Sequence, residues 1–135
     1  QYLKERDCPL LIYQGRLNLI DRAPQDQGIL DYCAEQGIGF ISFSPLAQGL
    51  LTDRYINGIP ADSRMAKEHF LKHPALTPEL LDNLKAWNME AAAQGKTLAE
   101  EALAWILRQK GVTSVLVGAS SAAQLEKNMR CVYDC

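Results

Sequence analysis

The sequence predicts an α/β fold whose strands run parallel. Three short apolar runs of strand length alternate with stretches in which apolar residues recur at helical spacing. Strands separated by helices favour parallel pairing through right-handed crossovers. The segments after the second and third runs offer backbone and side-chain donors suited to a phosphate-bearing ligand.

The first half of the chain predicts two strands and one helix. Residues 9–14 are almost wholly apolar, as expected of a strand buried on both faces. Residues 29–34 follow with apolar side chains at helical spacing, and Gly37 is suited to end that helix. Residues 39–44 form the second predicted strand, and Pro45 ends it.

The second half begins with a long loop and predicts three helices and a strand. About thirty residues after Pro45 exceed the ~12 to 15 expected of an idle connection, so we expect a functional loop. Thr77 reads as the N-cap of one helix, and residues 97–100 read as the capping box of the next. Residues 112–117 form the third strand, and residues 121–129 form the last clear helix.

Composition limits the function. The chain has 135 residues, 47% of them hydrophobic and 22% charged, which suits one globular unit over residues 1–135. A net charge of -2 with scattered cations argues against nucleic-acid partners, and the longest apolar runs are far too short for membrane insertion. Four cysteines form no Cys-x-x-Cys pair, which favours reduced thiols and a cytoplasmic location.

Three parallel strands fit an open doubly wound sheet or a (β/α)8 barrel. In barrels, ligands lie at the carboxyl ends of the strands, and a phosphate site commonly follows the last two strands. A dinucleotide fold of the open type needs Gly-x-Gly-x-x-Gly after a strand, whereas Gly37 and Gly39 precede theirs and lack the third glycine. We therefore expect about the last three β/α units of a barrel.

Polar or flat side chains at the predicted strand ends are candidate ligand contacts, each with a plainer alternative. Gln14 suits a ligand carboxamide, although a water-facing strand end is the simpler reading. Phe43 offers a flat face, although an aromatic there is more often core. The turn after it suits a pyrophosphate, but an ordinary turn is also consistent; its candidate residues are Ser44, Pro45, Leu46, Ala47 and Gln48.

Two arginines and the start of the last predicted helix supply further candidate ligand contacts. Arg54 and Arg64 stand on the long loop, where they would clamp phosphate oxygens or simply be solvated. Gly118 and Ser120 precede a helix N-terminus suited to an anion, although Gln124 also completes a capping box there. His69 and His73 lack a third ligand at a diagnostic spacing, so no metal site is predicted.

Several blocks in one order resemble the aldo/keto reductase family. They are residues 11–14 with Asn18, Leu19 and Arg22, residues 42–55, residues 57–64 and residues 117–128. The pieces Ser-Pro-Leu-Ala and Gly-Ile-Pro-x-x-Ser-Arg are similar to those of a subgroup that includes bacterial L-glyceraldehyde 3-phosphate reductases and potassium-channel beta subunits. The resemblance covers nearly the whole chain and implies its cofactor-holding C-terminal portion.

The resemblance implies NADPH as cofactor and reduction of small aldehydes or ketones by hydride transfer. It implies that Gln14 binds the nicotinamide carboxamide, Phe43 stacks on the nicotinamide, Ser120 and Gln124 contact the 2′-phosphate, and Asn128 contacts the adenine. Polar rather than acidic groups at this anion site favour NADPH over NADH. The catalytic tyrosine, lysine, aspartate and histidine of the family belong to the first half of the barrel, so no catalytic residue is assigned.

Three positions depart from the family pattern. Lys127 replaces the usual glutamate before the adenine-binding asparagine, so we expect Lys127→Glu to tighten NADPH binding. Gly15 and Leu17 stand where proline and tyrosine are common, on the expected substrate side.

Three functions are therefore weighed. The first is a reductase of small carbonyl substrates whose N-terminal barrel half lies outside this chain, which reads as if it starts inside a longer protein. The others are a non-catalytic NADP-sensing subunit and an inactive truncated fragment. A homo-oligomer is compatible with each.

Overall fold

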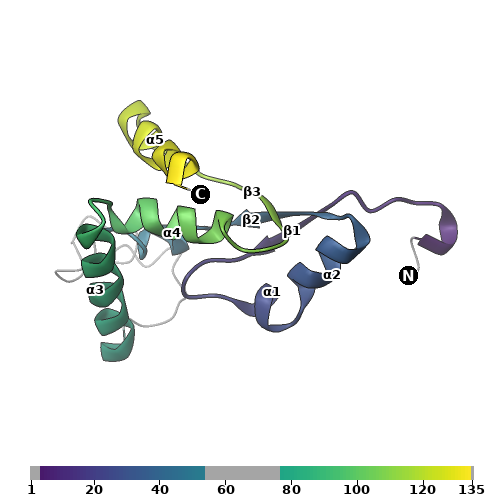
Figure 1. Ribbon diagram of the computed structural model, residues 1–135, viewed down its shortest axis with the longest axis horizontal. Helices are drawn as coiled ribbons and strands as arrows, with labels where there is room; N and C mark the ends of the chain where they lie inside the picture. The colour runs from purple at the N-terminus through teal and green to yellow at the C-terminus, as the bar shows by residue number, and fades with distance from the viewer. Residues whose placement is uncertain (1–3, 54–76, 135) are drawn as a thin grey trace.

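The computed structural model describes residues 4–53 and 77–134. Three parallel strands form one sheet in the order β1-β2-β3 (Figure 1). They are β1 (Ile12–Arg16), β2 (Gly39–Phe43) and β3 (Val112–Val115). The predicted α/β fold with parallel strands is confirmed.

Helices connect and cover the strands. The short α1 and α2 pack against β1 and β2, whereas α4 packs against β3, α3 and α5 (Figure 1). The helices are α1 (Ala23–Asp26), α2 (Ile29–Gln36), α3 (Pro78–Ala93), α4 (Leu98–Leu107) and α5 (Ala122–Met129), with 3₁₀ turns η1 (Lys4–Arg6), η2 (Ala47–Gly49) and η4 (Arg130–Asp134). The sequence did not predict α1 or these turns.

Local signals set the helix ends as predicted. Gly37 caps α2 in the left-handed region at φ 67°, where a Cβ would be strained. Thr77 accepts a hydrogen bond from the Leu80 amide at the start of α3. Thr97 and Glu100 form the complete capping box of α4.

The first strand differs most from its prediction. β1 begins at Ile12 and runs to Arg16, so Gln14 lies inside the strand rather than at its end. Its side chains are not buried on both faces: Ile12 is 55% exposed, and Leu11 just before it is 71% exposed. Both follow because β1 is a sheet edge with one open face in the described part of the chain.

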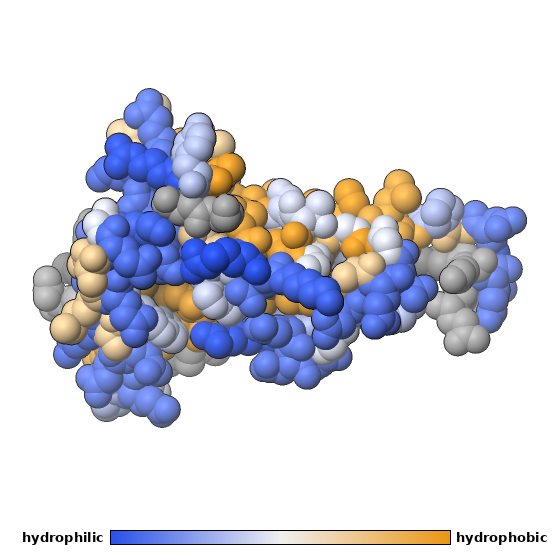
Figure 2. Space-filling view, viewed as in Figure 1, coloured by the Kyte–Doolittle hydropathy of each residue, from blue (hydrophilic) through white to orange (hydrophobic). Residues whose placement is uncertain are grey.

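The two faces of the sheet have different surroundings. Phe40 and Ser42 of β2 point to the helices and are fully buried, whereas Ile41 and Phe43 alternate with them and are only half-buried. On the face shown in Figure 2, hydrophobic residues reach the surface near the middle of the molecule, and hydrophilic residues surround them. In the described part of the chain, helices thus cover the face of Phe40 and Ser42, and the face of Ile41 and Phe43 has no helical cover.

Three hydrophobic clusters make the core of the described residues, and the third consists of Leu103, Ala104 and Cys131. In the first, Leu17 and Phe40 pack with Leu30 and Cys33 of α2 and Ile106 of α4. Burial raises the pKa of the Cys33 thiol, which favours its protonated form. The second cluster joins the loops to α3 and α4 through Leu19, Leu51, Leu84, Leu98 and Ala102.

The structure explains the residues at two positions near β1, Gly15 and Leu17, which depart from the family pattern. Leu17 is fully buried in the core, so it does not form a substrate-side wall. A Cβ on Gly15 would lie 2.8 Å from Phe40 Cζ, which requires glycine here unless the ring moves. The C-terminal residues also form an element that was not predicted, because Cys131 is buried and anchors η4.

Candidate nucleotide-binding site

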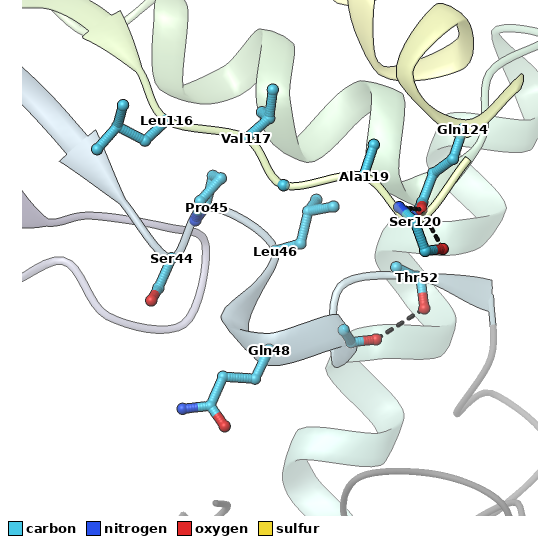
Figure 3. A pocket seen from close by; sticks show the side chains of 12 residues that line it. Ser44, Pro45, Leu46, Gln48, Thr52, Leu116, Val117, Ala119, Ser120 and Gln124 are labelled. Atoms are coloured by element: carbon cyan, nitrogen blue, oxygen red, sulfur yellow. Dashed lines mark hydrogen bonds between the residues drawn. The ribbon is translucent and has the colours of Figure 1, made fainter. Parts of the chain in front are cut away.

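Two loops at the carboxyl edge of the sheet enclose a cleft of about 520 Å³. One loop follows β2 and the other follows β3, and Figure 3 shows the two loops side by side, with Leu46 between them. The cleft is lined by Ser44, Pro45, Leu46, Gln48, Gly49, Thr52, Leu116, Val117, Gly118, Ala119, Ser120 and Gln124. Seven of these are sequence-predicted site residues, so two distant segments meet as the parallel topology requires.

The loop after β2 has an unusual backbone. Ser44, Ala47 and Gln48 hold φ values of 52°, 45° and 59°, in the left-handed region that non-glycine residues rarely adopt. Each such residue costs on the order of 1–3 kcal/mol, and such strain concentrates at ligand sites. Three such residues fall within five positions of this segment.

Neighbouring groups hold this loop in place. Asn18 is 2% exposed, and its Nδ2 donates to the Ser44 carbonyl at 3.0 Å. Its Oδ1 accepts from the amides of Ile20 and Asp21 at 3.0 and 2.8 Å. Asn18 therefore joins the loop after β1 to the loop after β2. Sequence reasoning gave it no role, although an asparagine inside the apolar run 17–20 was an available signal.

The opposite wall begins at α5. Ser121 caps the helix by accepting from the Gln124 amide, as predicted. The Gln124 side chain, however, accepts from both the amide and the hydroxyl of Ser120, at 2.8 and 2.9 Å. It therefore reaches one residue beyond the N-cap, and the expected capping box forms only in part (Figure 3). The contact fixes Ser120 at the rim of the cleft.

Other predicted residues lie beside the cleft or outside the described part. Ala47 lines a neighbouring hollow of about 540 Å³, which it shares with Ser44 and Gln48. In Figure 3 the Gln48 amide points away from Ser120. Asn128 is 4% exposed within α5, and its Nδ2 has no hydrogen-bond partner in the part of the chain that the structure describes. Arg54, Arg64, His69 and His73 fall outside the described residues.

Gln14 and Phe43 share the open face of the sheet. Gln14 lies beside Ile41, and Arg16 lies beside Phe43 in the strand register, with side chains alternating between faces. Gln14 is exposed, and Phe43 is half-buried. The Arg16 guanidinium carbon lies 5.5 Å from the centre of the Phe43 ring. A flat ligand ring on Phe43 would thus have an amide and a cation nearby.

A buried carboxylate on α4, Glu100, interacts with positive charges on α5 and η4. Glu100 is 7% exposed; its Oε2 accepts from the Thr97 amide and hydroxyl, and its Oε1 lies 4.0 Å from Arg130 Nη1. Burial alone would raise the pKa of Glu100, but these hydrogen bonds and the charges of Arg130 and Lys127 outweigh it and lower the pKa. Lys127 therefore acts electrostatically on a buried carboxylate.

The described residues of the cleft offer neutral hydrogen-bonding groups. None of its lining residues carries a formal charge, and no cluster of three metal-ligating side chains occurs in residues 4–53 and 77–134. Backbone donors, serine hydroxyls and a helix start are groups that hold an anionic ligand. The fold and cleft thus define an α/β protein with a candidate nucleotide-binding site at the carboxyl edge of its sheet.

Comparisons with known proteins give the family. The family model described as "Aldo/keto reductase family" matches residues 1–133, and the chain belongs to this family of oxidoreductases, which generally use NAD(P)H. It is 45% identical to L-glyceraldehyde 3-phosphate reductase of Escherichia coli K12, over 98% of this chain and 39% of that protein. It is 34% identical to a probable voltage-gated potassium channel subunit beta of Arabidopsis thaliana, over 90% and 38% of the two chains.

A solved structure agrees with this assignment at the level of fold. The thermostable aldo-keto reductase Tm1743, crystallised with epalrestat, matches with a TM-score of 0.65 and 21% identity. The match covers 93% of this chain and 35% of that one. The chain therefore spans about two-fifths of the length of its curated reductase relatives. In the described residues, no helix is long and apolar enough to cross a membrane.

Proposed function

We propose that the complete protein is an NADPH-dependent oxidoreductase that reduces small aldehydes and ketones to alcohols. In this proposal residues 1–135 are the last three β/α units of a (β/α)8 barrel and hold the cofactor. The observation that carries it is the cleft, where a strained loop after β2 faces the start of α5. Family membership supports the same chemistry.

The cofactor would lie along the carboxyl edge of the sheet. Phe43 would stack on the nicotinamide, and Gln14 would hold its carboxamide from the same open face. The loop from Ser44 to Gln48 would meet the pyrophosphate. The other proposed contacts are Arg54 and Arg64 on the long loop, Gly118, Ser120 and Gln124 at the cleft, and Asn128 on α5. The buried Asn128 Nδ2, which has no hydrogen-bond partner among the described residues, supports the adenine end of this arrangement.

NADPH rather than NADH is favoured by the charge of the site. Ser120 and Gln124 are neutral, and no carboxylate of residues 4–53 and 77–134 lines the cleft. A carboxylate there would repel a 2′-phosphate. The free thiols of Cys8 and Cys33 support a cytoplasmic location. The partners would be a carbonyl substrate, the N-terminal half of the barrel and, in an oligomer, further copies.

The test uses the protein produced from the complete coding sequence. NADPH binding is measured by quenching of tryptophan fluorescence, and turnover by loss of NADPH absorbance with glyceraldehyde. Binding and turnover are expected, with NADH bound more weakly than NADPH. Failure to bind either cofactor would refute the proposal.

A second function has its own support. The 34% identity to a probable potassium channel subunit beta favours a cofactor sensor without turnover. The same experiment separates the two, because a sensor would bind NADPH but reduce no aldehyde. An upstream half that lacks the catalytic tyrosine and lysine would support the sensor.

A further inference from the structure

Arg16 is the one cation on the described part of the open sheet face at the ligand edge. It is the last residue of β1, two positions after Gln14, and its Cα partner across the sheet is Phe43. Its side chain is exposed and lines both hollows that flank this strand end, one beside Phe43 and one beside Ser44 and Ala47. The sequence reading assigned it no role.

The guanidinium is held without being neutralised. It lies 5.5 Å from the centre of the Phe43 ring, and no carboxylate of the described residues forms an ion pair with it. A ring supports the flat face of an arginine while leaving its N–H edge available. That edge matches the two oxygens of a carboxylate or phosphate.

Three other charged residues line the hollow beside Ser44 and Ala47, namely Arg22, Asp21 and Asp26. Arg22 lies 4.8 Å from the Trp105 ring, and its Nε donates to the Leu19 carbonyl. Asp21 accepts from the Ala23 amide, and Asp26 belongs to α1. These two acids are the negative charges that line the hollow, and neither is within ion-pair distance of Arg16.

We propose that Arg16 recognises an anionic group, phosphate or carboxylate, on the carbonyl substrate. This inference rests on the proposed function, in which Phe43 stacks on the nicotinamide. A carbonyl carbon must come within about 3–3.5 Å of its hydride donor. The far end of a three- or four-carbon substrate then lies within reach of an arginine beside Phe43, and the flexible stem lets the guanidinium leave the ring when the nicotinamide occupies it.

The test compares matched substrates with the full-length enzyme. Glyceraldehyde 3-phosphate is paired with glyceraldehyde, and succinic semialdehyde with butanal, so each pair differs mainly in one anionic group. Arg16→Gln is expected to lower kcat/KM for an anionic member by about 10- to 100-fold, and to leave its neutral partner within about twofold. Arg16→Lys should restore part of the preference.

Lys110→Gln is the matched charge control. It removes one exposed positive charge before β3, at the opposite edge of the sheet, and should leave both preferences unchanged. Loss confined to the phosphate pair assigns phosphate as the group recognised, and loss confined to the carboxylate pair assigns carboxylate.

Equal losses on charged and neutral substrates, or no loss, would overturn the role of Arg16 while leaving the reductase function intact. A wild-type enzyme that binds NADPH but reduces none of the four aldehydes would refute the reductase itself, and the inference with it.

Discussion

At the scale of single residues, the candidate site depends on side chains that hold the backbone rather than on those that face the cleft. Ser44 adopts a left-handed conformation, and its carbonyl is fixed by Asn18. Ser42 Oγ likewise donates to the Leu17 carbonyl at 2.8 Å, inside the core. Two buried polar contacts thus set the separation of the first two loops.

Asn18→Ala tests this link. The substitution removes three hydrogen bonds and leaves the Ser44 carbonyl and two amides without that partner. We expect the free energy of unfolding to fall by about 1–3 kcal/mol and the dissociation constant for NADPH to rise. Urea unfolding and fluorescence titration of the full-length protein measure both. Unchanged affinity in a destabilised variant would show that Asn18 does not position the loop.

Gly15→Ala tests the packing of Phe40. The new Cβ would lie 2.8 and 2.9 Å from two ring carbons of a fully buried side chain. We expect a loss of about 1–3 kcal/mol, measured by urea unfolding. Gly118→Ala is the matched control, because its Cβ would meet nothing within 4 Å. Equal unfolding midpoints for the two variants would contradict the close contact.

At the scale of elements, α5 is attached to the molecule partly by charge. The carboxylate of Glu100 closes the α4 capping box with one oxygen and faces Arg130 with the other. Glu101, one position further, instead pairs with Lys96 and Arg108. The two adjacent acids therefore serve different contacts, as their positions around a helix predict.

Stability should depend on the ionisation of Glu100. Its pKa is lower in the folded than in the unfolded chain, so its contribution is complete above the unfolded value of about 4.3 and is lost as pH falls through the lower folded value. Glu100→Gln should reduce stability at pH 7 and flatten its decline in acid, measured by urea unfolding from pH 7 to 3. Glu126→Gln removes the same charge from an exposed position and serves as control. An unchanged slope in Glu100→Gln would contradict this role.

Lys127→Glu has two expected effects. The sequence predicts tighter NADPH binding, through an added acceptor for the adenine. The structure adds a cost, because the new carboxylate would repel Glu100, whose ionisation Lys127 now favours. We expect a lower free energy of unfolding at pH 7 together with a lower dissociation constant for NADPH. Lys127→Gln is the comparison variant, because it removes the attraction between Lys127 and Glu100 without adding a carboxylate that repels Glu100.

At the scale of the whole molecule, the open sheet face is the dominant feature. Leu11, Ile12 and Leu116 are 71%, 55% and 48% exposed, and β1 has an unpaired edge in the described chain. Open edges and exposed apolar patches promote association. The proposed barrel would cover this face with the remaining strands.

The isolated 135-residue chain should therefore self-associate. We expect its sedimentation to depend on concentration, and charged residues in place of Leu11 and Ile12 should reduce the association. Tyr133, 88% exposed and away from the sheet, offers a control position. A monomer with cooperative, concentration-independent urea unfolding would contradict this expectation.

The sequence alone determined the alternation of strands and helices, the helix caps and the two loops of the site. These features depend on residues close in sequence: Thr77 and Thr97 cap their own helices, and Gly37 ends its own. Seven predicted residues consequently line one cleft.

Only the tertiary structure decided which side chains hold or surround that site. Asn18 and Ser44 are 26 residues apart, and the burial of Leu17, Gly15 and Glu100 depends on helices that pack from elsewhere in the chain. The end of β1 at Arg16, and its ring contact with Phe43, likewise follow from pairing with β2. Contacts between distant segments leave no periodic signal in sequence, because they are set by how the elements pack.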